Sequence, residues 1–126
     1  MKLVIGGYAQ GKLDYVLLKY NLNKNIVWDS VLPDCTLVQE TIVINHLHLW
    51  IKNCMLEGRC PEEEILLFLD SCQDCIIISD EVGNGIVPIN VFEREYRERV
   101  GKILIQVAER AEEVERVICK IGQKIK

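Results

Sequence analysis

The sequence SDEVGNGIVPINVFEREYRERVG, residues 79–101, decides which fold this chain is expected to adopt. It follows the β-branched run 75–78, which is typical of a buried strand. Asp80 and Glu81 then stand at the carboxyl end of that strand, where ligands bind in open α/β sheets. Residues that loosen or stiffen the backbone come next, namely Gly83, Gly85 and Pro88. Spacing alone leaves a ligand-binding loop and an ordinary strand-to-helix turn equally open.

A second motif lies near the start of the sequence, where residues 2–5 are predicted to form a strand. The residues that follow make up most of a P-loop, G-x-x-x-x-G-K-[ST], whose backbone N–H groups face a phosphate while the lysine reaches the outer phosphates. The position that should carry Ser or Thr for magnesium is Leu13, which has no oxygen. We therefore expect the loop to hold phosphate without a metal ligand at Leu13. The predicted nucleotide-binding residues are Gly6, Gly7, Tyr8, Ala9, Gln10, Gly11, Lys12 and Leu13.

Together the motifs resemble those of the bifunctional adenosylcobinamide kinase / adenosylcobinamide-phosphate guanylyltransferase family. The family signature reads roughly N-E-V-G-x-G-I-V-P, followed by R-x-[FY]-R-[DE]-x-x-G. Asp80 replaces the leading Asn. The matching positions are Glu81, Val82, Gly83, Gly85, Ile86, Val87, Pro88, Arg94, Tyr96, Arg97, Glu98 and Gly101. The resemblance implies an α/β, RecA-like P-loop NTPase with a mostly parallel sheet flanked by helices. It also implies GTP or ATP as ligand, a corrinoid substrate and a homo-oligomer, namely a trimer, with Trp28 or Trp50 at its interfaces.

The expected magnesium ligands are absent from this sequence. Residues 41–44 are predicted to form a strand, and the segment after it resembles the family pattern D-C-L-T-x-W-x-x-N, whose aspartate is the Walker B acid. Asn45 stands in place of that aspartate and brings no negative charge to a metal. Magnesium is thus possible only with substitute ligands, for which Asp80 and Glu81 are the candidates. The positions that keep the pattern are Leu47, Trp50 and Asn53.

The histidines of this region allow two interpretations. His46 and His48 alternate along the chain, so that on an extended segment both would point the same way and could hold a metal. We favour polar contacts near the end of the sheet instead. Neither histidine occupies the place of the one that accepts the guanylyl group in the family. That place falls in a segment replaced here by residues 29–40, which contain no histidine, so guanylyl transfer is expected to be absent.

The carboxyl-terminal third is predicted to form a long amphipathic helix, because apolar residues recur at steps of three and four. These residues are Phe92, Tyr96, Val100, Ile103, Val107, Ala111 and Val114. Arg94 and Arg97 keep the family pattern, and a guanidinium fork suits phosphate or carboxylate, so we predict a structural or ligand-binding role for both. The family's Asn-Gln pair is replaced by Leu104 and Ile105. A final strand is predicted at residues 115–121.

The composition favours one compact domain, residues 1–126. Alternating strands and helices, with further elements predicted at 25–28 and 61–71, indicate a mostly parallel sheet with right-handed crossovers. The net charge of −4 argues against nucleic-acid binding. Without a long apolar run or a signal peptide, we expect a cytoplasmic protein with no membrane span. Its cysteines, Cys72-x-x-Cys75 included, are expected to be reduced thiols rather than a zinc or redox site.

Three functions remain open. The first is an active cobalamin-pathway kinase that also transfers a guanylyl group. The second is a divergent homologue that binds a nucleotide or corrinoid with impaired catalysis, which explains the substitutions at Leu13 and Asn45 together with the missing histidine segment. The third is a non-catalytic assembly or partner-binding module that keeps only the fold. The second is preferred, because phosphoryl transfer depends on magnesium for both positioning and charge neutralisation.

Overall fold

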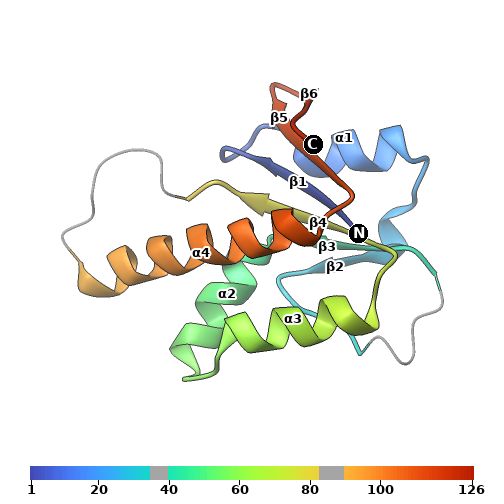
Figure 1. The fold of residues 1–126 in the computed structure, drawn as a ribbon. Coiled ribbons are helices and arrows are strands. Elements are labelled where there is room, and N and C mark those ends of the chain that lie inside the picture. The colour runs from blue at the N-terminus through green and yellow to red at the C-terminus, as the bar shows by residue number, and fades with distance from the viewer. Residues whose placement is uncertain (35–39, 83–89) are drawn as a thin grey trace.

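The computed structural model describes residues 1–34, 40–82 and 90–126 (Figure 1). Within these residues one sheet has the strand order β2-β3-β4-β1-β5-β6. Neighbouring strands run parallel, except that β6 is antiparallel to β5. The mostly parallel α/β architecture is therefore confirmed. The strands are β1 (Lys2–Gly6), β2 (Val27–Asp29), β3 (Ile42–Asn45), β4 (Cys75–Asp80), β5 (Glu113–Ile118) and β6 (Ile121–Lys124).

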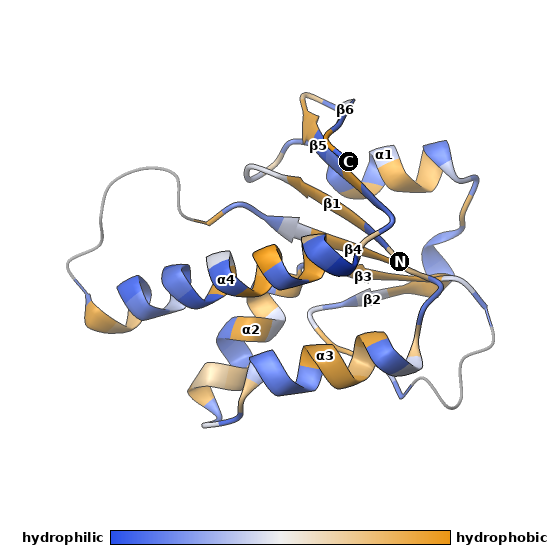
Figure 2. Ribbon diagram, viewed as in Figure 1, coloured by the Kyte–Doolittle hydropathy of each residue, from blue (hydrophilic) through white to orange (hydrophobic). Residues whose placement is uncertain are grey.

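Helices cover both faces of the sheet. They are α1 (Lys12–Lys19), α2 (Leu47–Leu56), α3 (Pro61–Ser71) and α4 (Val91–Arg110), with a 3₁₀ turn at Lys24–Ile26. The start of α3 was predicted correctly, because Pro61 and three glutamates suit a first helical turn. Asn90 caps α4 by accepting hydrogen bonds from the backbone N–H groups of Phe92 and Glu93. The apolar stripe of α4 faces inward and its charged face lies outside (Figure 2).

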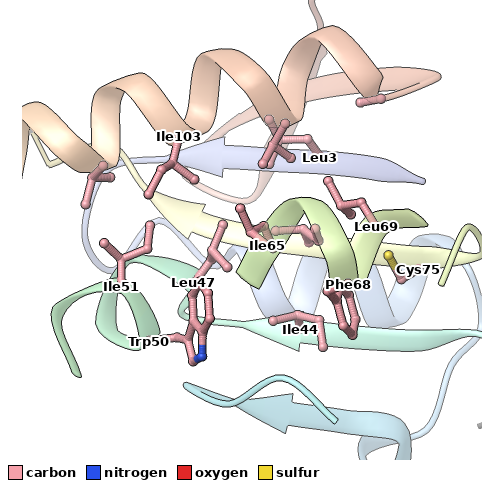
Figure 3. Close-up of a cluster of buried hydrophobic side chains, with 14 of the residues drawn as sticks. Leu3, Ile44, Leu47, Trp50, Ile51, Ile65, Phe68, Leu69, Cys75 and Ile103 are labelled. Carbon is pink, nitrogen blue, oxygen red and sulfur yellow. The ribbon is translucent and has the colours of Figure 1, made fainter. Parts of the chain in front are cut away.

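The sheet separates two apolar cores, because successive side chains of a strand point to opposite faces. On one face, Leu3, Ile44 and Ile77 pack with residues of α2, α3 and α4, including Leu47 and Ile103 (Figure 3). On the other face, a smaller core meets α1 and contains Val4, Val16, Val43, Ile76, Ile78 and Val117. Strand β4 is buried along its whole length, as expected of a central parallel strand.

The structure corrects the predicted end of the long helix. It stops at Arg110, Ala111 takes an extended conformation, and Val114 belongs to β5. Ala111 and Val114 are both buried in the larger core. Their spacing therefore matches the apolar pattern of the helix, although neither residue is helical. The predicted final strand at 115–121 is in fact a hairpin, because Cys119 and Lys120 form a turn between β5 and β6.

Two smaller expectations near the sheet edge also change. The strand predicted at 25–28 is Val27–Asp29, and the residues before it form the 3₁₀ turn. Trp50 is buried in the larger core and is 4% exposed, so it cannot serve as an interface residue. Trp28 is 40% exposed. Over the described residues, no helix has the length and apolar character needed to cross a bilayer.

Candidate functional site

The glycine-rich loop joins β1 to α1 at the carboxyl end of the sheet. Gly11 caps α1 with a left-handed backbone (φ 79°), which glycine adopts without steric cost. Lys12, the first residue of α1, is buried. Its Nζ donates a hydrogen bond to the Gly7 carbonyl at 2.6 Å and lies 2.7 Å from Asp80 Oδ1. The lysine thus turns back across the loop and is neutralised by the carboxylate at the end of β4.

His48 contacts both the backbone and the side chain of Asp80. The Asp80 backbone N–H donates to His48 Nδ1 at 3.1 Å, and Asp80 Oδ2 lies 3.4 Å from His48 Nε2. Because Nδ1 accepts a hydrogen bond, the proton of the neutral ring belongs on Nε2, which faces the carboxylate. Burial lowers the pKa of His48 below its ordinary value, against the raising effect of Asp80. The histidine therefore supports Asp80 as a neutral hydrogen-bond partner.

Tyr96 secures the same arrangement from α4. Its hydroxyl donates to the backbone carbonyl of His48 at 2.9 Å, and burial raises the Tyr96 pKa to about 12. Lys52 lies 5.2 Å from the centre of the Tyr96 ring and 3.0 Å from Glu93. The tyrosine of the 79–101 segment is thus a structural residue that joins α4 to the start of α2.

Asn45 and His46 form a second polar group at the end of β3. His46 Nδ1 lies 2.5 Å from Asp29 Oδ1, and the Asn45 side-chain amide lies 3.4 Å from both of those atoms. The two histidine rings meet edge to face, with centroids 5.5 Å apart. Among the described residues, no group of three or more His, Cys, Asp or Glu side chains is arranged to hold a metal ion. The polar contacts favoured for the histidines are present.

A cleft of about 310 Å³ brings together much of the predicted site. Lys12, Asp80, Asn45 and His46 all line this cleft together with residues of the loop. Gly6 lies beneath the loop, and Gly7 supplies the carbonyl bound by Lys12. The lining residues are Tyr8, Ala9, Gln10, Gly11, Lys12, Leu13, Asp14, Asn45, His46 and Asp80.

Glu81 lies on the other side of the sheet. Its Oε2 is 3.0 Å from Arg116 Nη2, and its backbone N–H donates to the Gly6 carbonyl at 2.8 Å. It lines a different cleft, of about 490 Å³, beside Arg97 and the apolar residues of α4. Arg94 is exposed on α4. Of the predicted acids and arginines, only Asp80 therefore lines the loop cleft, as far as the described residues show.

Some predicted positions lie outside the described residues. These are Gly83, Gly85, Ile86, Val87 and Pro88, which complete the 79–101 motif. Cys72 and Cys75 are buried and form no disulfide, and Cys75 Sγ donates to the Cys72 carbonyl. Burial also raises the pKa of Cys54. The cysteines described here thus carry neither a disulfide nor a metal cluster.

Sequence reasoning missed two contacts of the site. His48 was considered for metal binding, whereas its partner is the backbone and side chain of Asp80. Gln10 was treated only as a loop residue, although its side chain and carbonyl both accept hydrogen bonds from the β5–β6 turn. Neither contact has a local signal, because each joins residues far apart in the chain.

A parallel sheet in which a glycine-rich turn carries a buried lysine into the first helix defines a P-loop NTPase-like fold. The chain belongs to the family described as cobinamide kinase / cobinamide phosphate guanyltransferase (CobU), whose model matches residues 20–125. The matched region begins after the glycine-rich loop. The family expected from the 79–101 segment is thus confirmed.

Two curated relatives are similar to the chain. The bifunctional adenosylcobalamin biosynthesis protein CobU of Salmonella typhimurium is 38% identical over 108 residues, covering 78% of this chain and 59% of the relative. The Escherichia coli protein of the same name is 39% identical over 67 residues, covering 50% of this chain and 37% of that protein. The chain therefore spans about three fifths of the length of the Salmonella relative.

Proposed function

We propose that this chain is a cobalamin-biosynthesis homologue that binds a nucleoside triphosphate, GTP or ATP, at the glycine-rich loop, with impaired catalysis. The observation that carries the proposal is the placement of Lys12. It is the first residue of α1, and its ammonium group donates a hydrogen bond to the Gly7 carbonyl of the loop. A lysine at this point can reach the outer phosphates, while the start of the helix and the loop amides favour negative charge. The loop cleft is large enough to admit phosphates.

The ion pair between Lys12 and Asp80 affects how a phosphate group could bind at the loop. Phosphate would compete with Asp80 for the ammonium group, unless the Asp80 carboxylate instead held a magnesium ion, which would supply charge neutralisation to the phosphates. The family pattern has an aspartate after the strand at 41–44 and an asparagine before Glu81. This chain carries the two residue types exchanged, as Asn45 and Asp80, on adjacent strands. We propose Asp80 as the substitute magnesium ligand in preference to Glu81, which pairs with Arg116 on the opposite face.

The positions and contacts of the histidines support impaired guanylyl transfer. A nucleophilic imidazole needs a free ring nitrogen beside the nucleotide. His48 is buried with Nδ1 occupied by a backbone N–H, and His46 Nδ1 is engaged by Asp29. Burial and the occupied Nδ1 make His48 unsuited to attack on a nucleotide phosphate. The Asp29 contact involves only Nδ1 of His46, so His46 is disfavoured instead by its position, which is not that of the histidine that accepts the guanylyl group in the family. The corrinoid substrate and the trimeric assembly implied by the family resemblance remain part of this proposal, as does a single domain.

Calorimetric titration with GTP and with ATP, each with and without magnesium, tests nucleotide binding. We expect binding without magnesium, weakened roughly tenfold to a hundredfold by Lys12→Ala, because a charge-assisted contact is lost. Lys102→Ala is the matched control, since Lys102 is exposed on α4 away from the cleft. Strict magnesium dependence would favour an active kinase. Absence of binding would favour the alternative, a non-catalytic assembly or partner-binding module.

A labelling experiment tests the loss of guanylyl transfer. The protein is incubated with GTP labelled in the guanosine, and protein-bound label is measured before and after acid treatment. We expect no bound label. A stable, acid-labile adduct would contradict the proposal, and replacing His46 and His48 in turn would then show which ring carries it.

A further inference from the structure

The glycine-rich loop is joined to the β5–β6 turn through one residue, Gln10. Gln10 Oε1 accepts a hydrogen bond from the Cys119 backbone N–H at 2.8 Å, and the Gln10 carbonyl accepts one from the Lys120 N–H at 2.9 Å. Its side-chain amide nitrogen donates to the Tyr8 carbonyl at 3.4 Å. A primary amide carries both an acceptor oxygen and a donor nitrogen, so the Gln10 side chain can accept from the turn and donate to the loop at once. Gln10 therefore links the tip of the loop to a hairpin more than a hundred residues away.

The β5–β6 turn has a strained backbone conformation, which needs stabilising contacts. Cys119 and Lys120 both have positive φ, 50° and 62°, between the paired residues Ile118 and Ile121. Two-residue hairpin turns of this kind favour Asn-Gly, because side chains with a Cβ are strained there. Strained backbone persists only where its surroundings fix it. The two hydrogen bonds to Gln10 are contacts that fix this turn.

The hairpin also fits closely against both ends of the loop. A Cβ on Gly6 would lie 2.5 Å from the Val117 carbonyl oxygen, and a Cβ on Gly11 would lie 2.4 Å from Lys120 Cγ. Lys120 Nζ lies 3.5 Å from Asp14, a largely exposed pair that adds little energy. Hairpin and α1 stand side by side in Figure 1. The loop glycines thus make room for the hairpin as well as for any ligand.

From these contacts we propose that the β5–β6 hairpin sets the shape of the glycine-rich loop, and that Gln10 is the positioning residue through which it raises affinity for polyphosphate. The inference rests on the proposed function, since it assumes that the loop binds phosphates. Loop amides hold an anion well only when they are oriented before it arrives, because ordering them on binding costs free energy. The Gln10 side chain supplies that order through its hydrogen bonds to the turn and to the Tyr8 carbonyl.

The test compares Gln10→Met with the native protein. Methionine keeps the length of the side chain and removes its hydrogen bonds. We expect the variant to bind inorganic tripolyphosphate and GTP roughly threefold to tenfold more weakly, by similar factors, because the phosphate cradle alone is affected. Gln123→Met is the matched control: the same substitution on exposed β6 should leave both affinities unchanged. Thermal unfolding confirms that all proteins are folded at the titration temperature.

Amide hydrogen exchange gives a readout that needs no ligand. We expect Gln10→Met to speed exchange at Cys119, whose N–H loses its side-chain acceptor, while amides of β4 stay protected. If native protein binds phosphates and Gln10→Met binds them equally well, the inference is overturned. If exchange at the turn is unchanged, the inference is overturned as well. Failure of native protein to bind any phosphate overturns the proposed function instead, and the exchange result then reports on the hairpin contact separately.

Discussion

The two faces of the sheet differ in the size of their apolar cores and in the polar groups beside them. One face is covered by α2, α3 and α4 and holds the larger apolar core, whereas the other carries α1, a smaller core and the glycine-rich loop. Strand β4 contributes to both, because Ile77 and Ile78 point in opposite directions and so do Asp80 and Glu81. Adjacent acids of one sequence motif can therefore line two different clefts, because consecutive residues at the end of a strand point to opposite faces of the sheet.

The largest effect should come from truncating neighbouring isoleucines of β4. Ile77→Ala removes a fully buried side chain from the larger core, and we expect a loss of about 4 kcal/mol in unfolding free energy. Ile78→Ala, equally buried but facing the smaller core, should cost about 2 kcal/mol because α1 can settle into the space. Denaturant unfolding of both variants measures the difference. Equal losses would show that the two faces contribute alike.

Substitution of the adjacent acids should separate the two clefts. Asp80→Asn leaves the buried ammonium of Lys12 without its ion-pair partner, and we expect a loss of about 3 kcal/mol. The same change should strengthen magnesium-free binding of phosphate, since Lys12 is released. Glu81→Gln should cost less than about 1 kcal/mol, because the side chain of its partner Arg116 is 42% exposed. A larger loss for Glu81→Gln, measured by denaturant unfolding, would contradict this assignment.

The smallest effect concerns acid sensitivity on the outer surface of the three-helix face. Arg99 donates two hydrogen bonds of 2.7 Å to Glu62, and this lowers the pKa of Glu62 from 4.5 to about 2. A lowered carboxylate pKa stabilises the fold above pH 4.5, and that contribution is lost as the pH falls toward 2. For this partly exposed pair we expect about 1 kcal/mol.

Unfolding free energies of native protein and Glu62→Gln at pH 6 and pH 2.5 measure this contribution. The difference between the two proteins should shrink in acid. Glu63→Gln is the control, since Glu63 is exposed on the same turn of α3. A difference that stays constant with pH would show that the Arg99 contact does not favour the ionised form.

Sequence patterns predicted the fold well wherever local chemistry decides it. The β-branched runs gave the central strands, and Pro61 with its glutamates placed the start of α3. The same patterns failed at Val114, because burial against the same core gives identical spacing in a helix and in a strand. The turn at Cys119 was missed since it lacks the usual Asn-Gly pair.

The candidate site was predictable only in part. Lys12 and Asp80 could be named from the motifs, and the structure brings them together. Glu81 was grouped with Asp80 because the two are adjacent, although their side chains point to opposite faces where β4 ends. The roles of His48 and Gln10 depend on long-range contacts, which no local spacing encodes.

The exposed thiol of Cys119 is an attachment point for a fluorescent label. It stands on the turn whose backbone N–H donates to Gln10, so a fluorescent label attached there would lie next to the glycine-rich loop. With Cys35 and Cys60 replaced by serine, labelling could be directed to that thiol, because Cys54, Cys72 and Cys75 are buried. The strained turn would then report loop occupancy in real time, without a labelled nucleotide.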